Sequence, residues 1–374
     1  MPPIKATFPH MGTAHLSLTT LLDDLGLEPV VPSLTNQHSL ALGTKYAPEF
    51  ACFPLKVNLG NYLEAIDAGA ELILMVGGVG PCRLGYYAEV QREILRGLGY
   101  GCQLISLEPP QHRWGDFWRT MRRFIPVKNP VRIGTAIAFA VSKIAVVDKI
   151  ERLTCHLRPR ERRRGETSRA WAECQALLAP VSTWSALRLA VQRCYERMEA
   201  VEIERDRQVL HVALCGEVFM VLEPAVNFHL EGTLGELGVE VHREIYLSSW
   251  INQHLLGNSI TRGWYKRVRA LARPYLANFV GGHALESVAQ AVDAAVNGLD
   301  GLIHLSPFTC MPEIVAQSVL PMVSKSLKLP VMSIIIDEHA AETGIMTRLE
   351  AFLDLLARRR RKELAFSATV FSRR

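Results

Sequence analysis

Short apolar segments alternate with helix-patterned segments near both ends of this 374-residue chain, and this rhythm constrains its fold most strongly. Near the N-terminus, strand patterns over Lys5–Met11 and Glu28–Pro32 flank an amphipathic helical pattern over His15–Leu27. Parallel neighbouring strands need a crossover of about this length, whereas antiparallel strands need only a tight turn. The rhythm therefore predicts an α/β fold with doubly wound parallel sheets.

The pattern continues through the rest of the first third. A helix is predicted from Leu55 to Ala68, a strand over ELILMV, a helix from Arg83 to Gly97 and a strand over CQLISL. The segment Ser33–Cys52 is rich in small and polar residues, and we expect a long loop there.

The middle of the chain, Trp114–Arg207, contains helical patterns and no strand pattern. Strand and helix patterns then alternate again from Gln208 to the last helix, which ends near Leu364. A chain of this length exceeds one ordinary core. We therefore predict an N-terminal α/β domain over 1–113, a helical insert over 114–207 and a C-terminal α/β domain over 208–374.

Three of the eight cysteines share one local setting. Cys52, Cys82 and Cys310 each lie beside a proline, between an apolar or loop segment and the start of a predicted helix. Backbone N–H groups and the positive end of the helix dipole stabilise a thiolate at such a position. In open α/β sheets ligands bind at this edge, so the three thiolates indicate one soft-metal site assembled by the fold.

The other five cysteines are expected to be packing residues, because free cysteine is commonly a small buried hydrophobe. Among them Cys155, in LTCHLRPRE, could also lie near the metal site. Three isolated thiolates without a CxxC pair suit a cubane iron–sulfur cluster with one open iron better than closed structural zinc.

Several motifs resemble one known family. They are PHMG, TKYAPEFACFPLKVNLGNYLEA, GGVGPCRLGYYAEVQREIL, GEVFMVLEPAVN, LGELGVEVHREIYLSSWI, GGHALESV and LSPFTCMPEIVAQSVLP. Together they are similar to acyl-CoA dehydratase activase-related proteins, relatives of the 2-hydroxyacyl-CoA dehydratase subunits and the double-cubane cluster reductases. The likeness covers nearly the whole chain and is weakest in Trp114–Arg207.

The resemblance implies that Cys52, Cys82 and Cys310 bind a 4Fe-4S-type cluster, or part of a double cubane, between two flavodoxin-like (Rossmann-like) domains. It also implies low-potential electrons from a separate ATP-hydrolysing iron–sulfur activator, a homo- or hetero-dimer, and a small-molecule substrate such as a CoA thioester. Beside the cysteines, Gly78 and Gly80 would let the backbone approach the cluster, or they serve a tight strand-to-helix turn.

Two charged residues are candidates for catalysis. Arg83 directly follows Cys82 and could offset the cluster's negative charge or orient a carboxylate, or it is an exposed first-turn arginine. Glu217 and Glu223 flank a strand end, and Glu223, at a strand–helix junction, is the preferred candidate for proton transfer. A cap-and-turn role is expected for His283 and Glu286 in GGHALES.

Absent motifs and composition exclude other classes. The chain has no GxxxxGK[ST] loop and no GxGxxG after its first strand, so we expect no ATP or NAD site in it. Two arginine-rich tracts, Arg158–Arg169 and Ala357–Lys362, lack stacking aromatics, so a solvated face or a docking patch is favoured over nucleic-acid binding. The apolar stretch from Val131 carries Arg132 and Lys143, so we expect a cytoplasmic protein without a membrane span.

Three functions remain open. The favoured one is an iron–sulfur redox protein that passes an electron to a bound substrate for a difficult reduction or a radical dehydration. The alternative is a non-catalytic cluster carrier or assembly partner that docks through its basic tracts. The weakest is a two-domain small-molecule binder with structural cysteines, favoured only if the three thiols lie more than about 10 Å apart.

Overall fold

The computed structural model describes residues 2–77, 82–107, 124–253 and 259–371, and it contains two four-stranded, all-parallel sheets. The first sheet has the order β2-β1-β3-β4. Its elements along the chain are β1 (Lys5–Thr7), α1 (His15–Asp24), β2 (Glu28–Pro29), α2 (Gln37–Tyr46), α3 (Phe53–Asp67), β3 (Leu72–Val76), α4 (Leu84–Gly97) and β4 (Gln103–Leu107). This confirms the predicted doubly wound α/β fold in the N-terminal part of the chain.

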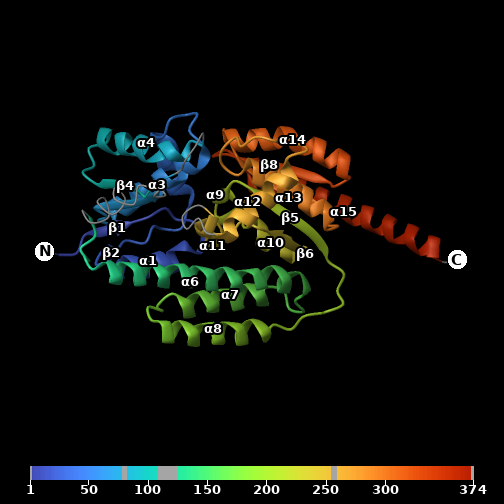
Figure 1. Cartoon of the computed structure of the whole chain (residues 1–374), viewed down its shortest axis with the longest axis horizontal. Coiled ribbons are helices and arrows are strands. Elements are labelled where there is room, and N and C mark those ends of the chain that lie inside the picture. Colours follow the sequence, from blue (N-terminus) through green and yellow to red (C-terminus); the bar gives the residue numbers. More distant parts are fainter. Residues whose placement is uncertain (1, 78–81, 108–123, 254–258, 372–374) are drawn as a thin grey trace.

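The second sheet repeats this order as β6-β5-β7-β8, and it lies beside the first one in Figure 1. Its elements are β5 (Leu210–Gly216), α9 (Val218–Leu222), α10 (Leu230–Glu236), β6 (Val239–Arg243), α11 (Leu247–Ile251), α12 (Ser259–Ala272), α13 (Ala284–Val296), β7 (Gly301–Pro307), α14 (Met311–Leu327), β8 (Val331–Ile336) and α15 (Glu342–Phe371). Both sheets therefore show the flavodoxin-like strand order that the resemblance implied.

Alternation along the strands explains why helices cover both faces of each sheet. In β3, Ile73 and Met75 pack in a cluster with α3 and α4, whereas Leu72 packs on the opposite face with α1. In β5, Val212 and Leu214 face one cluster while Ala213 and Cys215 face another. Side chains of a strand alternate between faces, so each sheet buries apolar residues on both sides.

Three helices lie between the two sheets along the chain and form a layer of their own: α6 (Pro130–Leu157), α7 (Glu166–Leu178) and α8 (Trp184–Glu199). Figure 1 shows them stacked below α1, with α6 innermost. These helices lie within the segment 114–207 that was predicted to be a helical insert, and the division into domains stays a prediction.

Within the described residues α6 is also the one helix long and apolar enough to cross a membrane, by length and composition alone. It contacts α1 on one side and α7 and α8 on the other. Of its most apolar 18-residue window, 39% is buried inside the structure.

A buried lysine joins these helices. Lys143 of α6 is inaccessible to solvent, and its Nζ donates to Thr20 Oγ1 at 3.1 Å and to the carbonyl of Val181 at 2.8 Å. Burial lowers the pKa of Lys143 to about 8, because the low-dielectric interior disfavours the ammonium form.

The lowered pKa predicts a pH-dependent stability difference for Lys143→Met. Between about pH 8 and pH 10.5 the unfolded chain holds the Lys143 proton and the folded chain releases it. The unfolded state then binds more protons, so raising the pH should stabilise the wild type relative to the variant by about 3 kcal/mol across this window. Urea unfolding of both proteins at several pH values measures this difference, and a pH-independent difference would contradict the burial of a titrating amine.

One helix lies where a long loop was predicted. The segment expected to be a loop, Ser33–Cys52, contains α2, which begins with a reciprocal capping box between Asn36 and Ser39. Small residues in this segment allow α2 to pack closely on α3: a Cβ on Gly43 would lie 1.8 Å from the carbonyl oxygen of Lys56. The loop prediction for this segment was wrong. Its small residues suggested a loop, but in the structure they let α2 pack closely against α3.

Part of each arginine-rich tract is engaged in ion pairs within the chain. In the first, Arg160 pairs with Glu240 at 2.6 Å and Arg164 with Glu236 at 2.8 Å. In the second, Arg360 pairs with Asp300 at 3.0 Å. These residues therefore have partners within the chain, and the remaining residues of the tracts could still serve as a docking patch.

Candidate functional site

Both sheets direct their carboxyl ends at one shared cavity of about 420 Å³. The loops that follow β1, β3, β5 and β7 supply Met11, Cys82, Glu217 and Cys310 to its wall. In each sheet the order reverses between its first and third strands, and such switch points are where open α/β sheets bind ligands. Here the two switch points contribute to the same cavity.

The three predicted thiols meet at this cavity. Cys52 is the N-cap of α3 and Cys310 is the N-cap of α14, so each thiol lies at the start of a helix as the sequence indicated. The thiols of Cys52 and Cys310 are within hydrogen-bonding reach, and Cys82 lies close enough to interact electrostatically with Cys52. The fold thus brings together two cysteines of the first α/β part and one of the second.

The sulfur atoms do not form the compact group expected around a single ion, since the three are not mutually within 4.8 Å. A cubane binds each thiolate through a different iron atom, so its ligands are spread more widely than those of one metal ion. The thiols of Cys52 and Cys310 lie closer together than the ligands of a cubane, so these two would have to move apart to hold one. Cluster binding itself remains a prediction.

The electrostatic setting of the thiols differs from the expectation. Burial, with a smaller contribution from the nearby carboxylate of Glu217, raises the pKa of Cys82 to about 11. The pKa of Cys310 is also raised, first by its hydrogen bond with Cys52 and then by burial. Helix N-termini alone therefore do not produce thiolates here. A bound cation would have to displace the protons, as metals do at cysteine sites.

Arg83 links the loops that present the thiols. Its Nη1 donates to the carbonyl of Phe50 at 2.9 Å and to Thr309 Oγ1 at 3.5 Å. The hydroxyl of Thr309 also donates to the Phe50 carbonyl at 3.3 Å. Thr309 has a φ of +62°, which is strained for a β-branched residue directly before Cys310. Arg83 thus ties the Cys52 loop to the Cys310 loop, a positioning role that the sequence did not predict.

One glycine near the thiols was not singled out from the sequence. A Cβ on Gly282, in the GGH turn, would lie 2.8 Å from Pro312 and 4.0 Å from the sulfur of Cys82, so this turn approaches the thiols closely. Gly78 and Gly80 lie outside the described residues, and their predicted role stays a prediction.

The two candidate carboxylates occupy different places. Glu223 is buried, and its Oε2 accepts from the Gly12 amide at 2.7 Å and lies 2.8 Å from His10 Nδ1. It joins the PHMG loop to the second α/β part, and it is not among the described residues that line the cavity. This geometry favours a structural role for Glu223 over the proton transfer predicted from the sequence.

Glu217 lines the cavity together with the three cysteines. It is the N-cap of α9, where its carboxylate accepts from the Met220 amide at 3.0 Å. Burial raises the pKa of Glu217 to about 7, so it can exchange a proton near neutral pH. The preference for Glu223 rested on its place at a strand–helix junction, which gave no information on which carboxylate faces the cavity.

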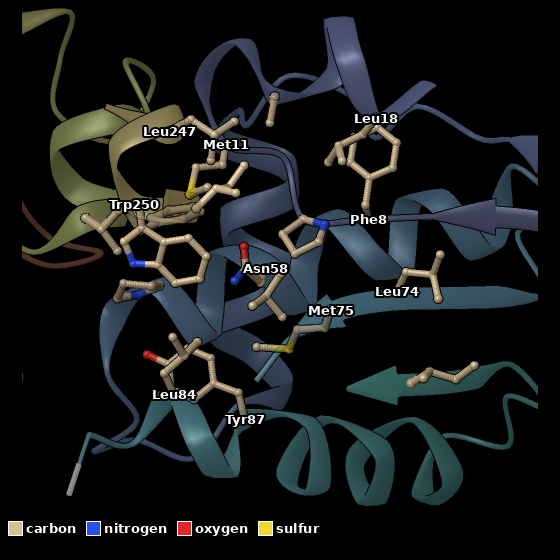
Figure 2. Close-up of a pocket in the computed structure, with 18 of the residues that line it drawn as sticks. Phe8, Met11, Leu18, Asn58, Leu74, Met75, Leu84, Tyr87, Leu247 and Trp250 are labelled. Carbon is tan, nitrogen blue, oxygen red and sulfur yellow. The ribbon is translucent and has the colours of Figure 1, made fainter. Parts of the chain in front are cut away.

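Most of the remaining wall is apolar. Figure 2 shows Met11, Asn58, Met75, Tyr87 and Trp250 around a common space. Their side chains extend into it from the loop after β1, from α3, β3 and α4, and from α11. The carboxamide Oδ1 of Asn58 is buried there with no hydrogen-bond partner among the described residues. An unpaired buried acceptor is costly, so this oxygen is a candidate contact for a ligand donor group.

Nothing in the sequence indicated that two further residues lie near the thiols, because both fit an ordinary helix pattern. Tyr87 of α4 is buried and hydrogen bonded to Cys52, and Asn58 lies one turn and a half into α3. Lys56, also near the start of α3, is buried and forms an ion pair with Glu338.

The other cysteines lie apart from the three thiols. Cys155 lies in α6 beside Glu151 and lines a different pocket near Glu240 and Arg243. Cys174 and Cys194 contact each other in the core between α7 and α8. Packing roles were predicted for these residues, and Cys155 does not line the candidate site.

Comparison with known protein families found no family model that matches this chain, and comparison with curated proteins found no match either.

Proposed function

We propose that this protein is an iron–sulfur redox protein of the 2-hydroxyacyl-CoA dehydratase-related type. The observation that supports this most is the meeting of Cys52, Cys82 and Cys310 at one cavity between two α/β parts. These thiols would hold a 4Fe-4S-type cluster, which supplies one-electron chemistry. Electrons would come from an ATP-hydrolysing activator, and the protein would act in the cytoplasm.

The residues around the thiols support a substrate beside the cluster. The apolar wall excludes water and favours an aliphatic or aromatic group, while Asn58 Oδ1 can accept a hydrogen bond from a polar one. Glu217 would accept or donate the proton that accompanies a reduction or dehydration. Arg83 would hold the Cys52 and Cys310 loops at their spacing through the Phe50 carbonyl and Thr309.

Anaerobic purification tests the cluster directly. We expect a brown, oxygen-sensitive protein with about four iron and four sulfide ions per chain for one cubane. Colourless protein with neither iron nor sulfide after anaerobic reconstitution would contradict the proposal.

The second candidate function is a non-catalytic carrier or assembly partner. An electron-transfer experiment distinguishes it from the enzyme. Cluster reduction by an activator and ATP, followed by oxidation only when a substrate is added, supports the enzyme. Stable docking of the activator without electron transfer supports the carrier. The size and apolar wall of the cavity favour the enzyme, because a carrier needs no substrate space beside its cluster.

A further inference from the structure

A second cluster of metal-binding side chains lies on the second sheet. It consists of His211 of β5 and Glu240 and His242 of β6, and one ligand atom from each lies within 4.8 Å of the others. Parallel pairing places His211 opposite Glu240 and Ala213 opposite His242, so all three side chains project from one face of the β5–β6 pair. We propose that these residues form a binding site for a zinc ion.

The distances suit a tetrahedral ion. His211 Nδ1 lies 2.9 Å from His242 Nε2 and 3.8 Å from Glu240 Oε2. Tetrahedral ligands about 2.0–2.1 Å from zinc lie roughly 3.3 Å from one another, between these two values. Imidazole nitrogens and a carboxylate are also the donors that suit zinc among the divalent ions.

Neighbouring residues hold the carboxylate in place. Arg160 donates to Glu240 Oε2 at 2.6 Å, and His156 Nδ1 lies 3.3 Å from Glu240 Oε1. Arg160 is itself held by the carbonyl of His156 at 2.9 Å. A carboxylate oxygen has two lone pairs, so Oε2 can accept from Arg160 and still bind a metal. Such outer contacts commonly orient metal ligands.

The site is open to solvent and accommodates a further ligand. His242 is exposed, and the three residues line a polar pocket of about 640 Å³ between β6 and α13. Three protein ligands leave the fourth position of zinc for a water molecule or a small anion.

This site is separate from the three thiols. His211 lies near the amino end of β5 and Glu217 just beyond its carboxyl end, so about 3.3 Å per residue puts them roughly 20 Å apart. In parallel sheets, substrates bind at the carboxyl ends of the strands. Zinc here would fasten β6 to β5 on the face opposite α10, and it would not take part in chemistry at the cavity.

The test must keep zinc away from the cysteines, which also bind it. We would therefore use the full chain with Cys52, Cys82 and Cys310 changed to serine, and add His211→Ala, His242→Ala or His242→Gln to it. His38→Ala is the matched control, because His38 is an exposed histidine that also contacts a carboxylate, Glu64, outside the site. Zn²⁺ affinity is measured by competition with a chromophoric chelator, and melting temperature with and without Zn²⁺.

We expect one zinc per chain, a melting temperature raised by Zn²⁺, and at least a tenfold loss of affinity in each His211 and His242 variant. The His38→Ala protein should bind like its parent. Circular dichroism shows whether the variants fold, and both histidines are accessible enough for alanine to be tolerated. Failure of the parent to bind Zn²⁺ at 10–100 μM, or equal binding by parent and variants, would overturn the proposal.

Discussion

Replacing Cys310 by serine is expected to remove at least nine-tenths of the iron that anaerobically purified protein retains. The same loss is expected for Cys52→Ser and Cys82→Ser, because each thiol would bind a different iron atom and serine is a poor ligand for this soft cluster. Iron and sulfide per chain, together with the visible absorption of the brown protein, measure the effect.

Cys102→Ser is the matched control for these variants. Cys102 lies in the first α/β part, just before β4, is half-buried, and does not line the cavity. It should keep the iron content of the wild type. Equal iron in the wild type and in all three site variants would show that the cluster, if present, is held elsewhere.

Gly43→Ala is expected to destabilise the protein by about 3 kcal/mol, the upper range for overpacking. The added Cβ would lie 1.8 Å from the Lys56 carbonyl oxygen and 3.1 Å from the Gly60 amide nitrogen, and these are backbone atoms that cannot rotate away. The helices α2 and α3 would have to separate. Urea unfolding measures the loss.

Gly134→Ala is the control for this change, since Gly134 lies on the exposed face of α6 with nothing within 4 Å of an added Cβ. Alanine there should stabilise the helix by about 1 kcal/mol. Because α3 begins directly after Cys52, Gly43→Ala should also lower iron retention, while Gly134→Ala should not. A Gly43→Ala protein as stable as the wild type would contradict the close α2–α3 packing.

Much of the fold could be predicted from periodicity. Long segments such as α14 and buried strands such as β7 have strong patterns, and their order along the chain leaves few topologies for a parallel sheet. α2 could not be predicted, because its small and polar residues match a loop unless its contact with α3 is known. A residue's local pattern says nothing about the element packed against it.

The candidate site could be predicted only in part, because local patterns do not show which residues the fold brings together. The cysteines share a local signal, a helix start beside a proline, so their common location at the sheet edge followed from the sequence. Glu217 and Glu223 share a strand-end setting, and only the tertiary structure shows that Glu217 faces the cavity while Glu223 bonds His10 and Gly12. His211 lies 31 residues before His242, and only the register of β5 and β6 brings the two together.

The origin of the three thiols in both α/β parts limits how this cavity can open. A cluster bound to Cys52, Cys82 and Cys310 would cross-link the two parts covalently at their facing edges. A hinge motion that spreads them would stretch Fe–S bonds, so substrate could not enter by the clamshell opening common in two-domain proteins. Access would instead depend on small side-chain and loop movements along the apolar wall near Met11 and Trp250. If the cluster binds as proposed, the two parts could separate only after it is lost, so their separation would follow oxidative damage and would not be a step of turnover.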